Sequence, residues 1–287
     1  NPNNTKTYKW KSKYPISSYL ISIAVTNYAQ YNNYFKYSIT DSMVVNHYVY
    51  PTDLNALKNS LDVTPKMLQL FSDKYSLYPF IKEKYGHAQF GWGGAMEHQT
   101  ISSMGSFGQG IVAHELAHQW FGDKVTCRDF NNIWLNEGFA TFSESLWIEF
   151  NEGREAYNSS IKLRMANARK AEGTLYVYNT NNVNEIFNSN RTYSKGAVVV
   201  HMLRGVLGDS TFFNVLKSYI NDSTLSYSTA VTEDLQRVAE NVSGKNLNYF
   251  FQQWVYGENY PVYNINFTKS QNQNGSYNVN VTLSQKI

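Results

Sequence analysis

HELAH, at residues 114–118, is the stretch of sequence that decides the fold of this chain, and it lies within GIVAHELAHQWFG at residues 110–122. His114 and His118 are about one helical turn apart, so on a helix both imidazoles would reach one metal ion, with Glu115 at the edge of the site. The flanking residues are nearly apolar, which gives two buried imidazoles no other evident purpose. The alternative is a pair of polar residues on an amphipathic helix. We predict a metal site.

A catalytic zinc ion normally takes three protein ligands and keeps a fourth position for water. Glu137, in NNIWLNEGFA at residues 131–140, lies nineteen positions after His118. That distance allows one helix to end, a loop to turn and a second helix to return antiparallel, with Glu137 facing the histidines. Glu144 lies two turns further along the same face, where it is either an acceptor that orients an imidazole or a solvated carboxylate. The sequence leaves both roles open for Glu144.

Apolar residues follow two different periods along the rest of the chain. Alternation of apolar with polar residues, together with β-branched and aromatic residues, predicts strands at residues 19–26, 34–39 and 43–50. Two further short strands are predicted to flank the glycines of residues 91–94. Helical spacing begins at Thr64, and after Gln109 it predicts helices at residues 109–121, 133–150, 154–171, 193–207, 210–220, 232–241 and 247–256. Alternation returns on both sides of QNQNG at residues 271–275, which predicts a hairpin. The fold class is therefore α+β, with a mixed β-sheet lobe and a mainly α-helical lobe.

Composition excludes several classes of protein. The 287 residues contain 25 Lys and Arg against 22 Asp and Glu, and these charges are scattered rather than gathered, so no nucleic-acid partner is expected. Cys127 is the only cysteine, which excludes an intramolecular disulfide and a CxxC site and indicates a packed thiol. No apolar run approaches the roughly 18 residues of a membrane span. We expect a soluble chain whose compartment stays open, with a secreted or periplasmic location as one candidate.

Taken together, these motifs resemble those of peptidase family M1, the zinc aminopeptidases, which are gluzincins with a thermolysin-like catalytic domain. The resemblance runs from about Tyr19 to Pro261 and brings in two further motifs. GAMEH at residues 94–98 looks like the GxMEN exopeptidase motif, whose glutamate holds the free α-amine of the substrate. By that match Glu97 binds this amine. The other residues that the match places against the substrate are Gly94, Ala95 and Met96.

The second further motif is TYSKGA at residues 192–197, which resembles the segment that carries the family's catalytic tyrosine. This match gives that role to Tyr193, whose phenol stays protonated at neutral pH and can donate to an oxyanion. The resemblance also implies Glu115 as the general base that takes a proton from water. The ligands it implies for one zinc ion per chain are His114, His118 and Glu137. The substrates would be peptides with a free N-terminus.

The match departs from the family pattern in two respects. His98 stands where the motif has Asn, as in MEH-type variants of bacterial relatives, and we expect it to pack or to line the substrate edge. The flanking domains that are usual in the family do not fit into this length, so we interpret the chain as a catalytic-domain fragment. The expected parts are residues 1–18 as a remnant of a preceding β domain or linker, 19–257 as the catalytic domain and 258–287 as the start of a following β domain. The histidines expected to be structural are His47, His87 and His201.

Three other functions remain open at this stage. A thermolysin-type endopeptidase would share the metal site, but Glu97 argues against it. A leukotriene-hydrolase-like enzyme with epoxide activity belongs to the same family, and nothing in the sequence speaks for it specifically. A catalytically weak or silent scaffold or binding domain would have no reason to keep Glu115, Glu137 and Tyr193 together. The sequence therefore favours a zinc-dependent aminopeptidase.

Overall fold

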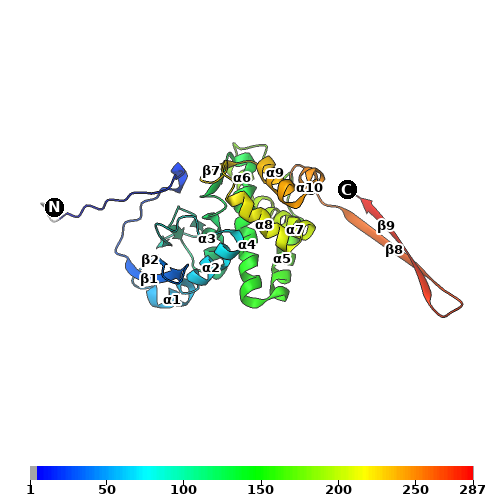
Figure 1. The fold of residues 1–287 in the computed structure, drawn as a ribbon, viewed down its shortest axis with the longest axis horizontal. Coiled ribbons are helices and arrows are strands. Elements are labelled where there is room, and N and C mark those ends of the chain that lie inside the picture. The colour runs from blue at the N-terminus through cyan, green and yellow to red at the C-terminus, as the bar shows by residue number, and fades with distance from the viewer. Residues whose placement is uncertain (1–4, 287) are drawn as a thin grey trace.

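A mixed β-sheet forms one lobe of the molecule (Figure 1). The structure is a computed structural model that describes residues 5–286. The sheet has the order β1-β2-β3-β5-β4, and its strands are β1 Ala29–Lys36, β2 Ser42–Val49, β3 Tyr85–Gln89, β4 Ala95–Met96 and β5 Ser102–Met104. The β1–β2 and β4–β5 pairs are antiparallel, whereas β2, β3 and β5 run parallel to one another. β4 is thus an edge strand, with one side of its backbone unpaired in the sheet.

Helices make up the second lobe and also connect β2 to β3. The connecting helices are α1 Leu54–Leu61 and α2 Thr64–Tyr75. The second lobe contains α3 Gln109–His118, α4 Trp134–Glu152, α5 Arg154–Ala168, α6 Val183–Ile186, α7 Gly196–Leu207, α8 Asp209–Ile220, α9 Thr232–Ser243 and α10 Asn248–Trp254. A π-helical segment, η4 Ser189–Lys195, leads into α7, and short 3₁₀ turns form η2 Ser18–Leu20 and η3 Phe130–Asn132. Strands β6 Val125–Cys127 and β7 Ser228–Ala230 pair in parallel.

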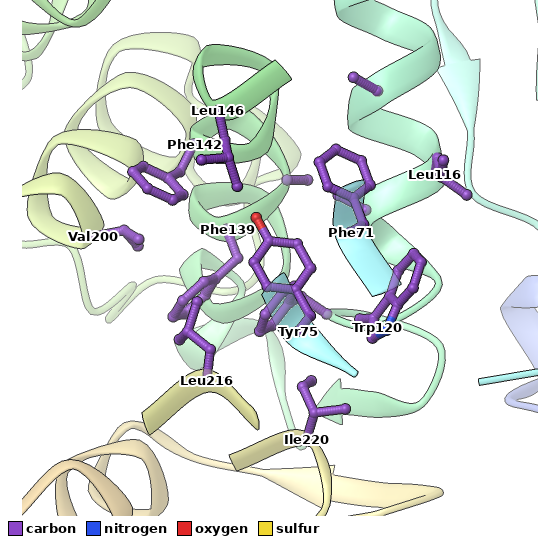
Figure 2. Close-up of a cluster of buried hydrophobic side chains, with 14 of the residues drawn as sticks. Phe71, Tyr75, Leu116, Trp120, Phe139, Phe142, Leu146, Val200, Leu216 and Ile220 are labelled. Atoms are coloured by element: carbon purple, nitrogen blue, oxygen red, sulfur yellow. The ribbon is translucent and has the colours of Figure 1, made fainter. Parts of the chain in front are cut away.

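Aromatic side chains fill the core between α2, α3, α4 and α8 (Figure 2). The ring of Tyr75 lies edge-to-face 4.9 Å from that of Phe121 and 6.1 Å from that of Trp120. Such pairs add about 0.5–1.5 kcal/mol each beyond the area that they bury. Phe139 of α4 stacks on Phe121, with the ring centroids 4.5 Å apart. Because Phe121 lies only three residues after the end of α3, this packing helps to fix the two helices that carry the predicted metal ligands.

The C-terminal hairpin and the N-terminal segment extend away from the two lobes on opposite sides (Figure 1). The hairpin consists of β8 Val262–Gln271 and β9 Tyr277–Lys286, which confirms the predicted hairpin. Every residue of both strands is exposed. The boundaries expected after residues 18 and 257 stay predictions. Residues 1–4 and 287, which belong to the two outer segments, lie outside the described residues.

One strand prediction near the N-terminus is wrong, and another has the wrong bounds. Residues 19–26 form no strand, because η2 ends at Leu20 and the next paired residue is Ala29. The alternating apolar side chains from Ile21 to Val25 imitate a strand, yet no neighbouring strand covers them and they are exposed. The strand expected at residues 34–39 is β1, which begins five residues earlier. Its first residues, AQYNN, are too polar to give a strand pattern in the sequence, although they pair with β2 in the structure.

The two-lobed α+β class is confirmed, and most differences in the helices concern their ends. The helix predicted from Tyr193 begins at Gly196, because the residues before it form η4. The helix predicted to reach Ala171 ends at Ala168. The elements α1, α6, β5, β6 and β7 are absent from the prediction. Within residues 5–286, no helix combines the length and the apolar character needed to cross a membrane.

Candidate active site

Three side-chain atoms from α3 and α4 meet in a buried cluster. Nε2 of His114 lies 3.1 Å from Nε2 of His118. Oε2 of Glu137 lies 3.2 Å from the first nitrogen and 3.3 Å from the second. All three residues are at most 9% exposed. One face of α3 carries both imidazoles and α4 packs against α3, so the predicted return of the second helix brings Glu137 to the histidines.

The outer nitrogens of both rings are already hydrogen bonded. Nδ1 of His118 lies 3.0 Å from the carbonyl oxygen of Phe121, and Nδ1 of His114 lies 2.9 Å from Oε1 of Glu144. Carbonyl and carboxylate oxygens accept, so each Nδ1 donates and each Nε2 can present a lone pair to the cluster. The sequence leaves two roles open for Glu144. Its contact with His114 favours the first, in which Glu144 accepts a hydrogen bond and orients the imidazole.

The donor set of this cluster fits a zinc ion. Two imidazole nitrogens and one carboxylate oxygen are ligands that zinc takes in catalytic sites. At metal–ligand distances of about 2.0–2.2 Å, tetrahedral ligands lie about 3.3–3.6 Å apart. The spacing here is 3.1–3.3 Å, and the same three residues form a group that could hold a metal ion. Without a metal ion, protons have to lie between these three atoms, because their lone pairs would otherwise face one another at hydrogen-bond distance.

Charges within the cluster shift its pKa values in opposite directions. Burial alone would lower the pKa of His118, but the carboxylates of Glu97 and Glu137 raise it to about 9. Burial alone would raise the pKa of Glu137, but the two histidines lower it to about 2. In the metal-free protein the imidazoles therefore take up protons, which a bound cation would replace.

Glu115 lies beside the cluster and is also buried. It is 5% exposed, and its Oε2 has no hydrogen-bond partner among the described residues. Burial raises the pKa of this carboxyl to about 8, against the lowering effect of His114 and His118. An unpaired buried carboxyl oxygen is costly, so Glu115 is suited to accept a proton from a molecule that enters the site.

The cluster lines a cleft of about 1010 Å³. The predicted substrate-binding residues line it as well, and they are Gly94, Ala95, Met96 and Glu97. β4 pairs with β5 on one side only, so its free edge can accept an extended peptide. Ligand atoms of Glu97, Glu115 and His118 lie within 4.8 Å of one another. The cleft thus holds two buried carboxyl groups next to the edge strand. His98 does not line the cleft, and its Nδ1 lies 2.8 Å from Oγ of Ser103, which indicates packing.

Tyr193 reaches the cleft from the π-helical segment η4. Its ring lies beside that of His114, with the centroids 6.0 Å apart and the planes at 22°. Burial raises the pKa of Tyr193 above its ordinary value, and the carboxylates of Glu137 and Glu97 raise it further. The phenol therefore keeps its proton and can donate it in a hydrogen bond.

The crossing of α4 and α7 sets the position of Glu137 relative to Tyr193. A Cβ on Gly196 would lie 2.8 Å from Cα of Gly138, and one on Gly138 would lie 3.0 Å from the backbone of Gly196. No side chain fits between two backbones this close, so a substitution has to separate the helices. Glu137 directly precedes Gly138, and Tyr193 lies three residues before Gly196. The close crossing therefore holds the side chains of Glu137 and Tyr193 in place relative to each other.

Tyr19 and Arg164 are among the residues that line the cleft without having been predicted from the sequence. Tyr19, on η2, lines the cleft, and burial followed by the carboxylate of Glu97 raises its pKa. Arg164, on α5, lines the cleft and forms an ion pair with Glu144. Neither residue belongs to a motif or a ligand spacing, so no signal in the sequence points to it.

Comparison with known proteins assigns the family. The family model described as Peptidase family M1 domain matches residues 95–254, more than half of the chain. The chain belongs to peptidase family M1. Aminopeptidase M1-C of Oryza sativa subsp. japonica is 31% identical over 285 residues, which cover 91% of this chain and 32% of that protein. Aminopeptidase N of Lactococcus lactis subsp. lactis is 35% identical over 163 residues, which cover 53% of this chain and 19% of that protein. This M1 chain spans about a third of the length of the first curated relatives that it matches.

Solved structures of M1 proteins share the fold. A variant of the M1 zinc metallopeptidase of Deinococcus radiodurans, bound to the substrate Tyr-Ser-Ala, matches with a TM-score of 0.75 at 26% identity, over 87% of this chain and 57% of that one. Legionella pneumophila aminopeptidase A, in complex with aspartic acid, matches with a TM-score of 0.76 at 19% identity, over 90% and 31% of the two chains, and supports the fold alone. The two lobes of this M1 chain thus form a thermolysin-like catalytic domain, as predicted.

Proposed function

We propose that this chain is a zinc-dependent aminopeptidase domain, which hydrolyses the first peptide bond of substrates with a free N-terminus. One observation carries the proposal: two imidazole nitrogens and one carboxylate oxygen lie 3.1–3.3 Å apart, beside further buried carboxylates. Membership of family M1 supports it. The curated relatives named above are called aminopeptidases, and the structure from Deinococcus radiodurans is called a zinc metallopeptidase.

His114, His118 and Glu137 would hold the zinc ion. When bound, such an ion polarises a carbonyl group and lowers the pKa of a bound water toward about 7. Glu115 then takes the proton of the attacking water on its buried carboxylate and delivers that proton to the leaving amine. Tyr193 donates a hydrogen bond to the oxyanion that develops on the scissile carbonyl.

Glu97 determines where the substrate is cut. Its carboxylate lies next to that of Glu115, where it would pair with the positive N-terminal amine of a peptide. The free edge of β4 would hold the same peptide extended, which brings its first peptide bond to the metal cluster. An N-acetylated peptide lacks the positive charge, so the site should cleave it poorly. Efficient cleavage of such a peptide would instead favour a thermolysin-type endopeptidase.

Glu115→Gln tests the proposal, with Glu152→Gln at the exposed end of α4 as the control. The measurements are zinc content per chain and hydrolysis of aminoacyl chromogenic substrates. We expect the Glu115 variant to keep its zinc and to lose about 10²- to 10⁴-fold in kcat, because proton transfer by a positioned group contributes that much. We expect the control to behave as wild type. A Glu115 variant with full zinc and full activity would contradict the mechanism, and an inactive wild-type chain with bound zinc would favour a silent scaffold.

A further inference from the structure

Arg164 of α5 is connected to the metal cluster through one side chain. Its Nη2 pairs with Oε2 of Glu144, and Oε1 of the same carboxylate lies 2.9 Å from Nδ1 of His114. Both oxygens of Glu144 are therefore engaged, one by each partner. Three side chains from α5, α4 and α3 form a continuous chain of contacts that ends at an imidazole of the cluster.

This chain of contacts is shielded from water. The side chains of Arg164, Glu144 and His114 are 25%, 18% and 11% exposed. Shielding matters because fully exposed ion pairs contribute little, whereas a partly buried charged hydrogen bond keeps its geometry. The backbone of α3 closes the other side, since a Cβ on Gly110 would lie 3.7 Å from Oε2 of Glu144. The carboxylate thus lies between α3 and the guanidinium.

The orientation of Glu144 matters for metal binding. An imidazole can bind a metal through Nε2 while its Nδ1–H donates to an acceptor, and that acceptor fixes the direction of the ring. Glu144 is such an acceptor for His114, but a glutamate side chain has three rotatable bonds and needs a second anchor. Arg164 is the other hydrogen-bond partner of Glu144 among the described residues. Its planar, permanently charged guanidinium suits that purpose.

We propose that Arg164 is a positioning residue for the metal site. It holds Glu144 in the orientation in which Glu144 accepts from His114, and so keeps Nε2 of His114 aimed at the ion. The inference rests on the proposed zinc site and extends it to α5. It gives Arg164 an effect on metal affinity without any contact with the metal.

A matched control lies on the same two helices. Arg154 of α5 pairs with Glu149 of α4 at 2.5 Å, so it joins the helices as Arg164 does. Glu149 also pairs with Arg204, and none of these three residues lines the cleft. Arg154→Gln therefore removes an ion pair between α4 and α5 that has no contact with the metal cluster. Arg164→Gln removes the pair that leads to His114.

The experiment measures the zinc dissociation constant of the full chain by competition with a chelator. We expect Arg164→Gln to bind zinc about tenfold more weakly, at the lower end of the roughly 10- to 100-fold range for groups that orient a ligand. Arg164→Lys, which keeps the charge without the planar fork, should lose less. Arg154→Gln should bind as wild type does. In a Glu144→Gln background, Arg164→Gln should add no further loss, because its effect passes through Glu144.

Several results would overturn the inference. One is a zinc affinity of Arg164→Gln within about twofold of wild type, and another is an equal loss in Arg154→Gln, which would indicate loosened helix packing. A raised KM at unchanged zinc affinity would mean that Arg164 binds substrate instead. Should Arg164→Gln fail to fold, Arg164→Lys carries the same test. A wild-type chain that binds no zinc would overturn the proposed function together with this inference, whereas equal affinities would overturn the inference alone.

Discussion

Two pairs of buried histidines occur among the described residues, one between strands of the sheet and one on helix α3. In the sheet, Nδ1 of His47 lies 2.9 Å from Nδ1 of His87. In the helical lobe, Nε2 of His114 lies 3.1 Å from Nε2 of His118. A tyrosine ring stacks beside one member of each pair, 6.0 Å away in both cases. The separation of the facing nitrogens is thus similar in the two pairs, although the rings stack at 17° in the sheet and lie edge-on at 77° on α3. The pairs also differ in their neighbours.

Hydrogen bonds account for the sheet pair without a metal. Nδ2 of Asn33 donates to Asp62, which turns Oδ1 of Asn33 toward Nε2 of His47 at 2.8 Å. His47 therefore donates through Nε2 and accepts through Nδ1 from His87. Nε2 of His87 has no partner among the described residues. One proton is shared between the rings, and no carboxylate of the described chain forms a hydrogen bond to either.

The surrounding charges separate the pKa values of the two pairs. Burial lowers the pKa of His47 to about 4 and that of His87 well below its ordinary value. Burial would do the same to His118, but nearby carboxylates raise its pKa to about 9. Two adjacent imidazoles are thus neutral packing groups in the sheet, whereas on α3 they belong to the proposed zinc site. The carboxylate of Glu137, more than the distance between histidines, distinguishes a metal site.

The largest expected difference concerns the two stacked tyrosines. Tyr193→Phe should lower kcat by about 10²- to 10³-fold with little change in KM, because it removes a hydrogen-bond donor to the oxyanion. Tyr31→Phe, beside His47, should leave kcat unchanged, since it removes only a hydrogen bond to Asp62. Steady-state kinetics on an aminoacyl substrate measure both. Equal activities of the two variants would contradict the role of Tyr193.

Acid should destabilise the protein through the sheet pair. The pKa of His47 is about 4 in the folded state against 6.5 as its ordinary value, so as pH falls the unfolded state takes up a proton first. The stability that His47 contributes is present above pH 6.5 and is lost between pH 6.5 and 4, about 3 kcal/mol in all. His47→Gln should lack this loss. Urea unfolding of both metal-free proteins at pH 7.5 and 4.5 measures the difference, and identical pH dependence would refute it.

Zinc should stabilise the protein through the helical pair alone. At a free zinc concentration a hundred times the dissociation constant, binding adds about 2.7 kcal/mol to the free energy of unfolding. We expect that gain in wild type and in His47→Gln, and its removal by a chelator. Glu137→Gln should gain much less, because it removes a proposed ligand. Thermal unfolding with and without zinc measures the gain, and a lost gain in His47→Gln would mean that the sheet pair also binds metal.

The smallest expected effect concerns the residue that fixes the sheet pair. Asn33→Ala leaves the N–H of His47 without its acceptor, which costs about 1–3 kcal/mol for a buried group and less here, because Asn33 is only half-buried. We expect a loss of about 1 kcal/mol in urea unfolding and an unchanged zinc affinity. A weaker zinc affinity in this variant would show that the two pairs are coupled.

How much the sequence predicts depends on how local each contact is. His114 and His118 are four residues apart on one helix, and the structure brings Glu137 to them as expected. His47 and His87 are forty residues apart, and only the parallel register of β2 and β3 places them opposite each other. No ligand spacing connects these two histidines in the sequence, so the sequence alone does not pair them.

The contact of Arg164 with Glu144 is also not predictable from the sequence, because it joins two different helices. It spans twenty residues and two helices, and any exposed Arg on α5 would look the same in sequence. Tyr193 is found only through the family resemblance, since the π-helical segment that presents it has no periodicity to predict it. Contacts within one helix can thus be predicted from spacing, whereas contacts that depend on strand register or helix packing cannot.

The close crossing at Gly138 and Gly196 bears on how this protein tolerates mutation. A methyl group at either position would push α4 away from α7, and with it Glu137 away from Tyr193. We therefore expect Gly138→Ala to reduce both activity and stability. No substitution at this position should reduce one and leave the other unchanged. Selection for thermostability and selection for activity act on this crossing in the same direction. Directed evolution of the domain should leave both glycines fixed and vary the walls of the cleft.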